Sequence, residues 1–215
     1  MREKIREAAR DLLIMHGYRG FRFGDIADRL GITRANVHYH YGTKSKLVDE
    51  VIEEYLAGTL KEIGAVWEAD LTYEEKVVAT MELNRRRYLR FNESNQVGGA
   101  PWSLISRMRL EANLLSEASR AQLRVFSDTM ERFADNAIDR AQANGEIATD
   151  APVHDIAVQI VSIVDSAGPI TQDAGSFVRL EHLYMAHVRV IAHAYVSKNK
   201  PKNRRRDILA AVASG

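Results

Sequence analysis

The 215-residue sequence contains no cysteine. Disulfide bonds and thiolate metal sites are therefore excluded, and a reducing compartment is compatible with the composition. Only four prolines occur, and few segments alternate apolar with polar residues. Because proline interrupts helices and alternation marks half-buried strands, this scarcity predicts an all-α fold of about nine helices.

Long apolar runs are also missing. The longest, Ile156 to Val164, is interrupted by Gln159 and Ser162 and is too short to span a bilayer. The first residues fit an amphipathic helix and lack the apolar stretch and cleavage site of a signal peptide. We therefore expect a cytoplasmic protein that does not insert into a membrane.

Charge of one sign is not in excess over the whole chain, because 30 basic residues face 29 acidic ones. Any surface for nucleic acid must then be local. The first fifty residues contain ten Lys or Arg against seven Asp or Glu, a net charge of 10 − 7 = +3. This bias is modest, but it places the positive charge at the N-terminal end.

Motifs for catalysis are absent as well. The sequence has no Gly-x-Ser-x-Gly and no His-Glu-x-x-His, and Gly42-Thr-Lys-Ser lacks the upstream glycine of a P-loop. His38 and His40 are two residues apart, and on a helix such side chains point in different directions. We expect neither an enzyme nor a bound cofactor or metal.

What the sequence does contain is a helix-turn-helix pattern near its start. A helix with apolar residues at helical spacing ends at Gly17, and a short second helix spans 23–30. Gly31 breaks the chain, and Thr33 can cap a third helix that is rich in polar and aromatic side chains. Two short helices around a glycine turn are typical of domains whose second helix enters the DNA major groove.

Three segments carry a resemblance to a known family. They are A-R-D-L-L-I-M-H-G-Y (9–18), D-I-A-D-R-L-G-I-T (25–33) and H-Y-H-Y-G-T-K-S-K-L (38–47). In this order and spacing the sequence resembles the TetR-type bacterial transcriptional regulators. The family usually has Tyr at His38, Phe at Tyr41 and Ser or Thr at Arg22. The resemblance implies that His40 and Tyr41 pack the N-terminal domain onto the fourth helix.

The third helix is the expected recognition helix. Arginine can pair with guanine and asparagine with adenine, while histidine and tyrosine reach bases or phosphates. Helix starts, with their free N–H groups, favour phosphate. The alternative is an ordinary solvated helix with simple caps. The predicted DNA-binding residues are Arg22, Thr33, Arg34, Ala35, Asn36, His38, Tyr39, Thr43 and Lys44.

We divide the chain into three parts. Residues 1–46 form a helix-turn-helix DNA-binding domain, and residues 47–197 form a larger helical domain for ligand binding and dimerisation. Residues 198–215 form a basic tail, predicted to be disordered, although it offers cations for phosphate contact. Within the larger domain the pattern predicts a capping box at Thr72–Glu75, a loop at 168–175 and a glycine C′ residue at Gly145.

Polar residues on apolar stripes suggest a ligand cavity in the larger domain. Asn84 aligns with apolar neighbours on the fifth helix, and an unpaired polar group there would cost roughly 1–3 kcal/mol. The family resemblance implies a cavity among the middle helices, although each residue also fits a plain core. The predicted ligand-binding residues are Asn84, Tyr88, Trp102, Met108, Phe126 and Met130.

The eighth and ninth helices are apolar over more of their surface than one subunit need cover. A two-fold bundle of these helices in a homodimer would bury them and present two recognition helices to a pseudo-palindromic site. The predicted interface residues are Ile156, Ile160, Val164, Tyr184, Val188 and Ile191.

Together these features predict a transcriptional regulator that binds double-stranded DNA as a homodimer. We expect a repressor that an unidentified small-molecule effector releases from its operator. The alternatives are an activator, a DNA-bound adaptor of the same fold that responds to a protein partner, and, least favoured, an enzyme.

Overall fold

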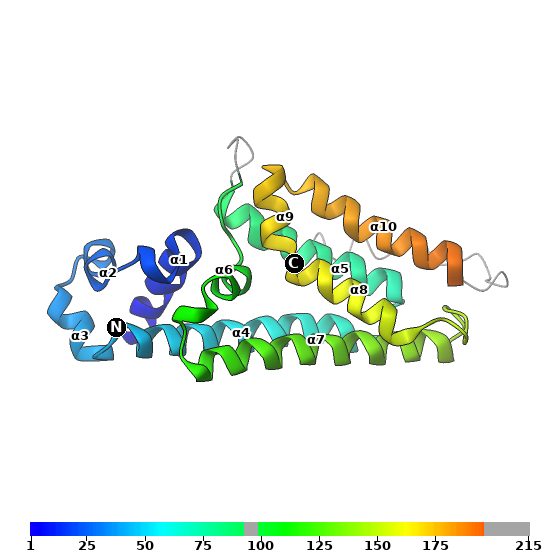
Figure 1. Ribbon diagram of the computed structural model, residues 1–215, viewed down its shortest axis with the longest axis horizontal. Helices are drawn as coiled ribbons and strands as arrows, with labels where there is room; N and C mark the ends of the chain where they lie inside the picture. The colour runs from blue at the N-terminus through cyan, green and yellow to red at the C-terminus, as the bar shows by residue number, and fades with distance from the viewer. Residues whose placement is uncertain (93–98, 196–215) are drawn as a thin grey trace.

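The computed structural model describes residues 1–92 and 99–195 and is all-helical over these ranges (Figure 1). It contains ten α-helices and one short 3₁₀ helix. The α-helices are α1 (Arg2–Gly20), α2 (Phe23–Leu30), α3 (Arg34–Tyr41), α4 (Lys44–Glu68), α5 (Tyr73–Phe91), α6 (Leu104–Leu110), α7 (Glu117–Ala143), α8 (Val153–Asp165), α9 (Ala167–Ala174) and α10 (Val178–Tyr195), and the 3₁₀ helix η1 is Ala112–Leu114. The predicted basic tail at 198–215 lies outside the described residues.

Helices α1 to α3 form a small domain, here called the head, at one end of an elongated molecule (Figure 1). Its turn is the predicted one: Gly31 follows α2 with a φ of 63°, in the left-handed region that glycine adopts without strain. Ile5, Ile26 and Val37, one from each helix, are fully buried and form the centre of the head. The exposed sides of the three helices are therefore left for contact with other molecules.

The remaining helices form the body, whose long axis is made by α4 and α7 lying side by side (Figure 1). Gly64 of α4 allows this approach, because a Cβ there would lie 3.0 Å from the Phe133 ring of α7. Helix α8 packs on α7, and α10 covers α5, α8 and α9. Since α4 begins at the head and runs into the body, it is the main mechanical link between them.

The predicted caps of the body helices are confirmed. Thr72 accepts a hydrogen bond from the Glu75 N–H, and the Glu75 carboxylate accepts one from the Thr72 N–H at 2.8 Å. After α7, Gly145 has a φ of 69°, and the Glu146 N–H donates to the Ala141 carbonyl at 2.8 Å. This is the glycine-ended helix terminus that the sequence predicts.

One predicted loop is wrong. Residues 168–175 were expected to be irregular because of Gly168-Pro169, but the segment contains α9 (Ala167–Ala174). Proline lies in the first turn of this helix, where a backbone N–H has no intrahelical acceptor, so it does not disturb the hydrogen bonding. The extra helix raises the total from the predicted nine or so to ten in the described chain.

No helix of the described residues is both long enough and apolar enough to cross a membrane.

A buried histidine makes the body sensitive to acid. The Tyr73 hydroxyl and His187 Nε2 share a hydrogen bond of 2.7 Å, and burial raises the pKa of Tyr73 so that the phenol keeps its proton. Burial lowers the pKa of His187 from 6.5 to about 4. At pH values between about 4 and 6.5, His187 is protonated in the unfolded chain and neutral in the folded chain. Stability is therefore complete above pH 6.5 and is lost as the pH falls toward 4.

We expect the free energy of unfolding to fall by about 2 kcal/mol per chain between about pH 7 and pH 5 because of His187. His187→Gln keeps an acceptor for Tyr73 but does not titrate, so its loss over this interval should be smaller by that amount. Urea unfolding followed by circular dichroism measures both. Identical pH dependence in the two proteins would contradict this role of His187.

Candidate nucleic-acid interface and ligand cavity

Helix α3 has one buried side and one exposed side. Val37 and Tyr41, four residues apart, are buried against the rest of the head. Arg34, His38 and Tyr39 lie on the exposed part of the helix, and Tyr39 is 85% exposed. An exposed tyrosine of this degree on a short helix is available for contact with another molecule.

Two threonines begin the helices that flank the glycine turn at Gly42. Thr33 Oγ1 accepts from the Asn36 N–H at 3.2 Å, and Thr43 Oγ1 accepts from the Lys46 N–H at 3.2 Å. Both threonines are exposed. Their hydroxyls thus fix the start of α3 and of α4, where the remaining free N–H groups favour an anion.

One polar side chain of α3, His38, is held from within the head, whereas Asn36 has a buried acceptor without a partner in the described parts of the chain. The His38 ring packs edge-on against Phe23, with 4.7 Å between ring centroids, and its Nδ1 lies 3.2 Å from the Gly42 carbonyl oxygen. Asn36 is half-buried, and its Oδ1 has no hydrogen-bond donor among residues 1–92 and 99–195. His38 is thereby oriented, while the Asn36 amide retains an unused acceptor.

The ammonium group of Lys44 has an internal partner that the sequence pattern does not reveal. Its Nζ donates to the Phe21 carbonyl at 2.5 Å and lies over the rings of Tyr18 and Phe21. Desolvation lowers the pKa of Lys44. Lys44 therefore joins α4 to the end of α1, whereas the exposed Arg22 beside it is free to meet solvent.

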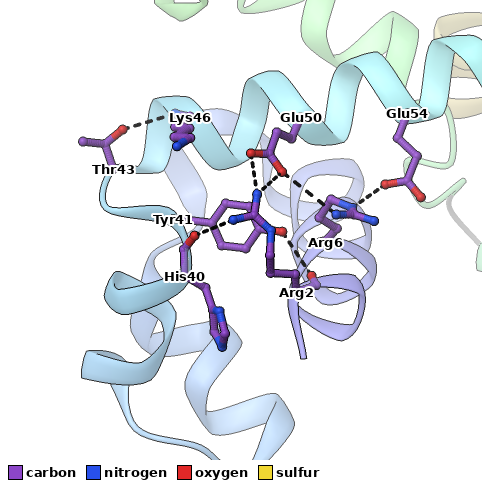
Figure 2. Close-up of polar contacts among 8 residues, drawn as sticks. All are labelled: Arg2, Arg6, His40, Tyr41, Thr43, Lys46, Glu50 and Glu54. Atoms are coloured by element: carbon purple, nitrogen blue, oxygen red, sulfur yellow. Dashed lines mark hydrogen bonds and ion pairs between the residues drawn. The ribbon is translucent and has the colours of Figure 1, made fainter.

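Ion pairs attach α1 to α4 (Figure 2). The Arg2 guanidinium donates to both carboxylate oxygens of Glu50 at 2.7 Å, and Arg6 Nε donates to Glu54 at 2.5 Å. The buried Tyr41 hydroxyl donates to the Arg2 carbonyl at 3.1 Å. These contacts hold α3, α1 and the first turns of α4 in a fixed arrangement.

Two further contacts connect the head to other parts of the body. The Glu111 carboxylate, after α6, accepts from the Tyr18 N–H of α1 at 2.5 Å. Arg90 of α5 donates to Asp11 of α1 at 3.2 Å. Residues this far apart in sequence carry no mutual signal in the amino-acid pattern, so the pattern does not predict these contacts.

The predicted ligand residues are only partly brought together. Asn84, Trp102 and Phe126 line an internal cavity of about 20 Å³, which is room for about one water molecule. The Asn84 amide donates to Tyr184 Oη, and the Trp102 indole donates to Thr171 Oγ1, both at 2.7 Å. The partners that Asn84 needs thus come from the protein.

The other three predicted ligand residues do not line this cavity. Tyr88 packs on the rings of Trp102 and Phe177. Met108 and Met130 are buried in the hydrophobic core. These three residues therefore pack in the hydrophobic core, which is the alternative to a ligand contact.

The structure revises the predicted dimer interface. Five of the six residues are buried within a single chain, because α8 and α10 turn these side chains toward α5, α7 and α9, and the sixth, Val164, is half-buried. A buried side chain cannot contact a second copy without unfolding. The five are Ile156, Ile160, Tyr184, Val188 and Ile191. The exposed apolar residues of the same helices are instead Val158, Val178, Leu183 and Val190.

No group of three or more His, Cys, Asp or Glu residues with metal-binding geometry occurs within the described ranges 1–92 and 99–195.

Residues 5–51 match the family model described as bacterial regulatory proteins, tetR family. No curated protein matches the chain significantly.

Solved structures match nearly the whole chain. A TetR-family regulator from Agrobacterium tumefaciens has a TM-score of 0.77 at 19% identity, covering 88% of this chain and 96% of its own. Reduced NemR from E. coli has a TM-score of 0.75 at 14% identity, with coverage of 92% and 98%. A regulator from Saccharomonospora viridis in complex with choline has a TM-score of 0.73 at 21% identity, with coverage of 92% and 98%. At these identities the likeness establishes the fold.

Proposed function

We propose that this chain, whose residues 5–51 match the family model of the tetR bacterial regulatory proteins, is a homodimeric transcriptional repressor that a small molecule releases from its operator. The observation that carries the proposal is the exposed side of α3, which presents Arg34, His38 and Tyr39 opposite the buried Val37 and Tyr41. Such a helix fits the major groove, where side chains read base edges and contact phosphates.

The remaining predicted contacts complete this interface in the proposal. Ala35 is exposed beside Arg34 and can meet a thymine methyl group, and the half-buried Asn36 follows it on the same helix. Arg22, Thr33 and Thr43 surround the start of α3 and α4, where phosphates are favoured. At Lys44 we propose that the backbone N–H, and not the internally bound ammonium, faces the phosphate.

Fluorescence anisotropy tests the DNA-binding part of the proposal. The purified protein is titrated into DNA from upstream of its own gene and into scrambled DNA of equal length, over a series of salt concentrations. We expect tighter binding to the upstream fragment, with the preference persisting as salt rises, since base contacts depend less on counterions than phosphate contacts do. Equal binding to both fragments, lost together with salt, would contradict sequence-specific recognition there.

We propose that ligand binding acts through α4. The ion pairs of Arg2 and Arg6 with Glu50 and Glu54 attach the head to this helix, so a ligand that shifts α4 in the body also shifts the recognition helix. A difference of a few kcal/mol in ligand affinity between two arrangements is enough to change operator occupancy. A structure of similar fold holds choline, which supports a small-molecule effector.

The second candidate is an adaptor of the same fold that binds a protein. The small size of the internal cavity, about 20 Å³, favours it. A pull-down alone does not separate the two candidates. They are separated by testing whether a metabolite extract, from which protein has been removed, releases operator DNA. Release would favour the repressor that responds to a small molecule.

We propose that the dimer forms through the outer side of α10 with α8 beside it. Leu183, Ala186 and Val190 are spaced by three and four residues and so share one side of α10. Leu183 and Val190 are exposed, as is Val158 of α8. Large exposed apolar residues in a row are typical of surfaces that a partner covers, and a second copy pairing about a two-fold axis would cover them.

Replacing Leu183 and Val190 together by glutamate is expected to weaken dimerisation by about 10- to 100-fold, because it places charges in an apolar contact. Analytical ultracentrifugation over a concentration series measures the dissociation constant. Val125→Glu is the control for a charge at an exposed apolar position, since Val125 of α7 is 57% exposed and Val190 is 56% exposed. An unchanged dissociation constant in the double variant would place the interface elsewhere.

A further inference from the structure

An open cleft of about 680 Å³ lies at the junction of head and body, distinct from the small internal cavity. Its lining comes from α1 of the head and from α4 and α5 of the body, together with Trp102. Four residues border both the cleft and the internal cavity: Tyr55, Thr59, Arg87 and Trp102. The cleft therefore lies next to residues that the sequence predicted to bind a ligand. Its volume is large enough for a small molecule.

The cleft is lined by an excess of positive charge. Five arginines and three glutamates face it, a net charge of 5 − 3 = +2. The arginines are Arg6, Arg10, Arg86, Arg87 and Arg90, and the glutamates are Glu7, Glu54 and Glu62.

Not all of this charge is neutralised. Arg6 pairs with Glu54 and Arg87 with Glu62, but the others compete for partners. The single carboxylate of Asp11 forms ion pairs with three arginines: Arg10 at 3.4 Å, Arg90 at 3.2 Å and Arg29 at 2.9 Å. Arg86 is exposed and makes no ion pair in the described parts of the chain. Guanidinium groups in this arrangement favour a carboxylate, which can accept two parallel N–H bonds.

Part of the cleft lining is apolar. Aliphatic and aromatic side chains from α1, α4 and α5 line it together with the Trp102 ring. A ligand that fits this lining has a charged end and an apolar body. The apolar lining residues are Ile14, Val51, Tyr55, Leu83, Phe91 and Trp102.

A glycine in the middle of α4 gives a second, independent observation. Gly58 lines the cleft, and a Cβ at this position would meet no atom within 4 Å. Its backbone is helical, so neither packing nor conformation requires glycine. Glycine inside a helix costs about 0.5–1 kcal/mol relative to alanine. A larger side chain at this position would occupy the cleft.

We propose that this cleft binds an amphipathic organic anion, with a carboxylate held by Arg86, Arg10 and Arg90 and an apolar body lying over Gly58. This inference rests on the proposed function, because the anion is taken to be the effector that releases the repressor from DNA. Arg10 belongs to the head, whereas Arg86 and Arg90 belong to the body. A carboxylate between them competes with Asp11 for Arg90 and so replaces a contact that joins α1 to α5.

The test uses two probes of equal shape and different charge. These are 1-naphthylacetate, an aromatic carboxylate, and 1-naphthylacetamide, its uncharged amide. Isothermal titration of the full chain should give at least about tenfold tighter binding of the carboxylate, because only it can accept charge-assisted hydrogen bonds from arginine. Equal affinity for the two probes would overturn the proposal.

Matched variants locate the site. Arg86→Gln should weaken carboxylate binding by about fivefold or more, because it removes one charge-assisted contact, and Arg132→Gln, on α7 outside the cleft, should not change it. Gly58→Trp should abolish binding by filling the cleft, whereas Gly58→Ala should preserve it. Thermal melting checks that each variant folds. Binding of the carboxylate by Gly58→Trp with wild-type affinity would exclude this cleft.

The same variants separate this inference from the proposed function. Operator binding without probe is expected to be equal in wild type and Gly58→Ala, because a Cβ at position 58 would meet no atom within 4 Å. The operator affinity of Gly58→Trp is measured first, because its side chain fills the space proposed for the effector, and release is compared at equal starting occupancy of the DNA. Failure of the wild type to recognise an operator would refute the proposed function and leave the calorimetry unaffected. If the carboxylate releases DNA from wild type but not from Gly58→Trp, both proposals are supported; release from both proteins would exclude the cleft as the effector site.

Discussion

Replacing Arg34 and Tyr39 together by alanine is expected to weaken specific operator binding by at least about 100-fold. Each side chain contributes on the order of 1–3 kcal/mol when it contacts a base or phosphate. The proposed dimer places two copies of each on the DNA, so the losses multiply. Both residues are exposed, so thermal stability and dimer formation should remain those of the wild type.

The salt dependence of the same measurement assigns the role of Arg34. If Arg34 contacts phosphate, Arg34→Ala in both subunits lowers the slope of log affinity against log salt by about 2, while a contact to a base leaves the slope nearly unchanged. Arg132→Ala on α7 is the control for the loss of an exposed arginine. Unchanged operator affinity in the double variant would remove α3 as the recognition helix.

The second large effect is expected at Gly17, where α1 deviates from helical geometry. Its φ and ψ are 72° and −179°, a combination that only glycine adopts without strain. A Cβ there would lie 2.6 Å from Glu111 Oε2 and 2.9 Å from Arg107 Nε. Gly17→Ala therefore combines backbone strain with a clash against the contact that joins α1 to the end of α6.

We expect Gly17→Ala to lower the free energy of unfolding by about 3 kcal/mol, the sum of strain and overpacking. For a chain of this size that corresponds to a fall in melting temperature of roughly 6–12 °C. Gly24→Ala is the control, since a Cβ at Gly24 of α2 would meet nothing within 4 Å. Differential scanning calorimetry measures both, and equal melting temperatures would show that the Gly17 geometry is not required.

The interior contacts of the head were predictable because they are local. Thr33 and Thr43 cap helices within three residues of themselves, Gly31 supplies a left-handed turn, and Val37 follows from the apolar period. Interactions of this range are encoded in residue type and spacing. The three motifs that resemble the TetR-type regulators lie in the same region, which is why the family match covers residues 5–51.

The body residues were predicted less well, and the dimer interface gives the reason. Hydrophobic periodicity indicates that a helix has an apolar side, but it does not indicate whether that side packs against the same chain or against another chain. Ile160 and Tyr184 turn inward, while Val158 and Leu183 on the same helices remain exposed. The difference is set by how α8 and α10 pack on their neighbours.

By itself, then, the sequence determined the helical fold, the helix-turn-helix and the exposed face of α3, since each depends on residues within a few turns of one another. Only the tertiary structure decided where the cavities lie and which charges remain available. Arg10 and Arg86 are 76 positions apart (86 − 10), yet both line one cleft because α1 and α5 both pack against α4 and contact each other through Arg90 and Asp11. Burial, ion pairing and empty space depend on which segments meet, and that is fixed by packing over the whole chain.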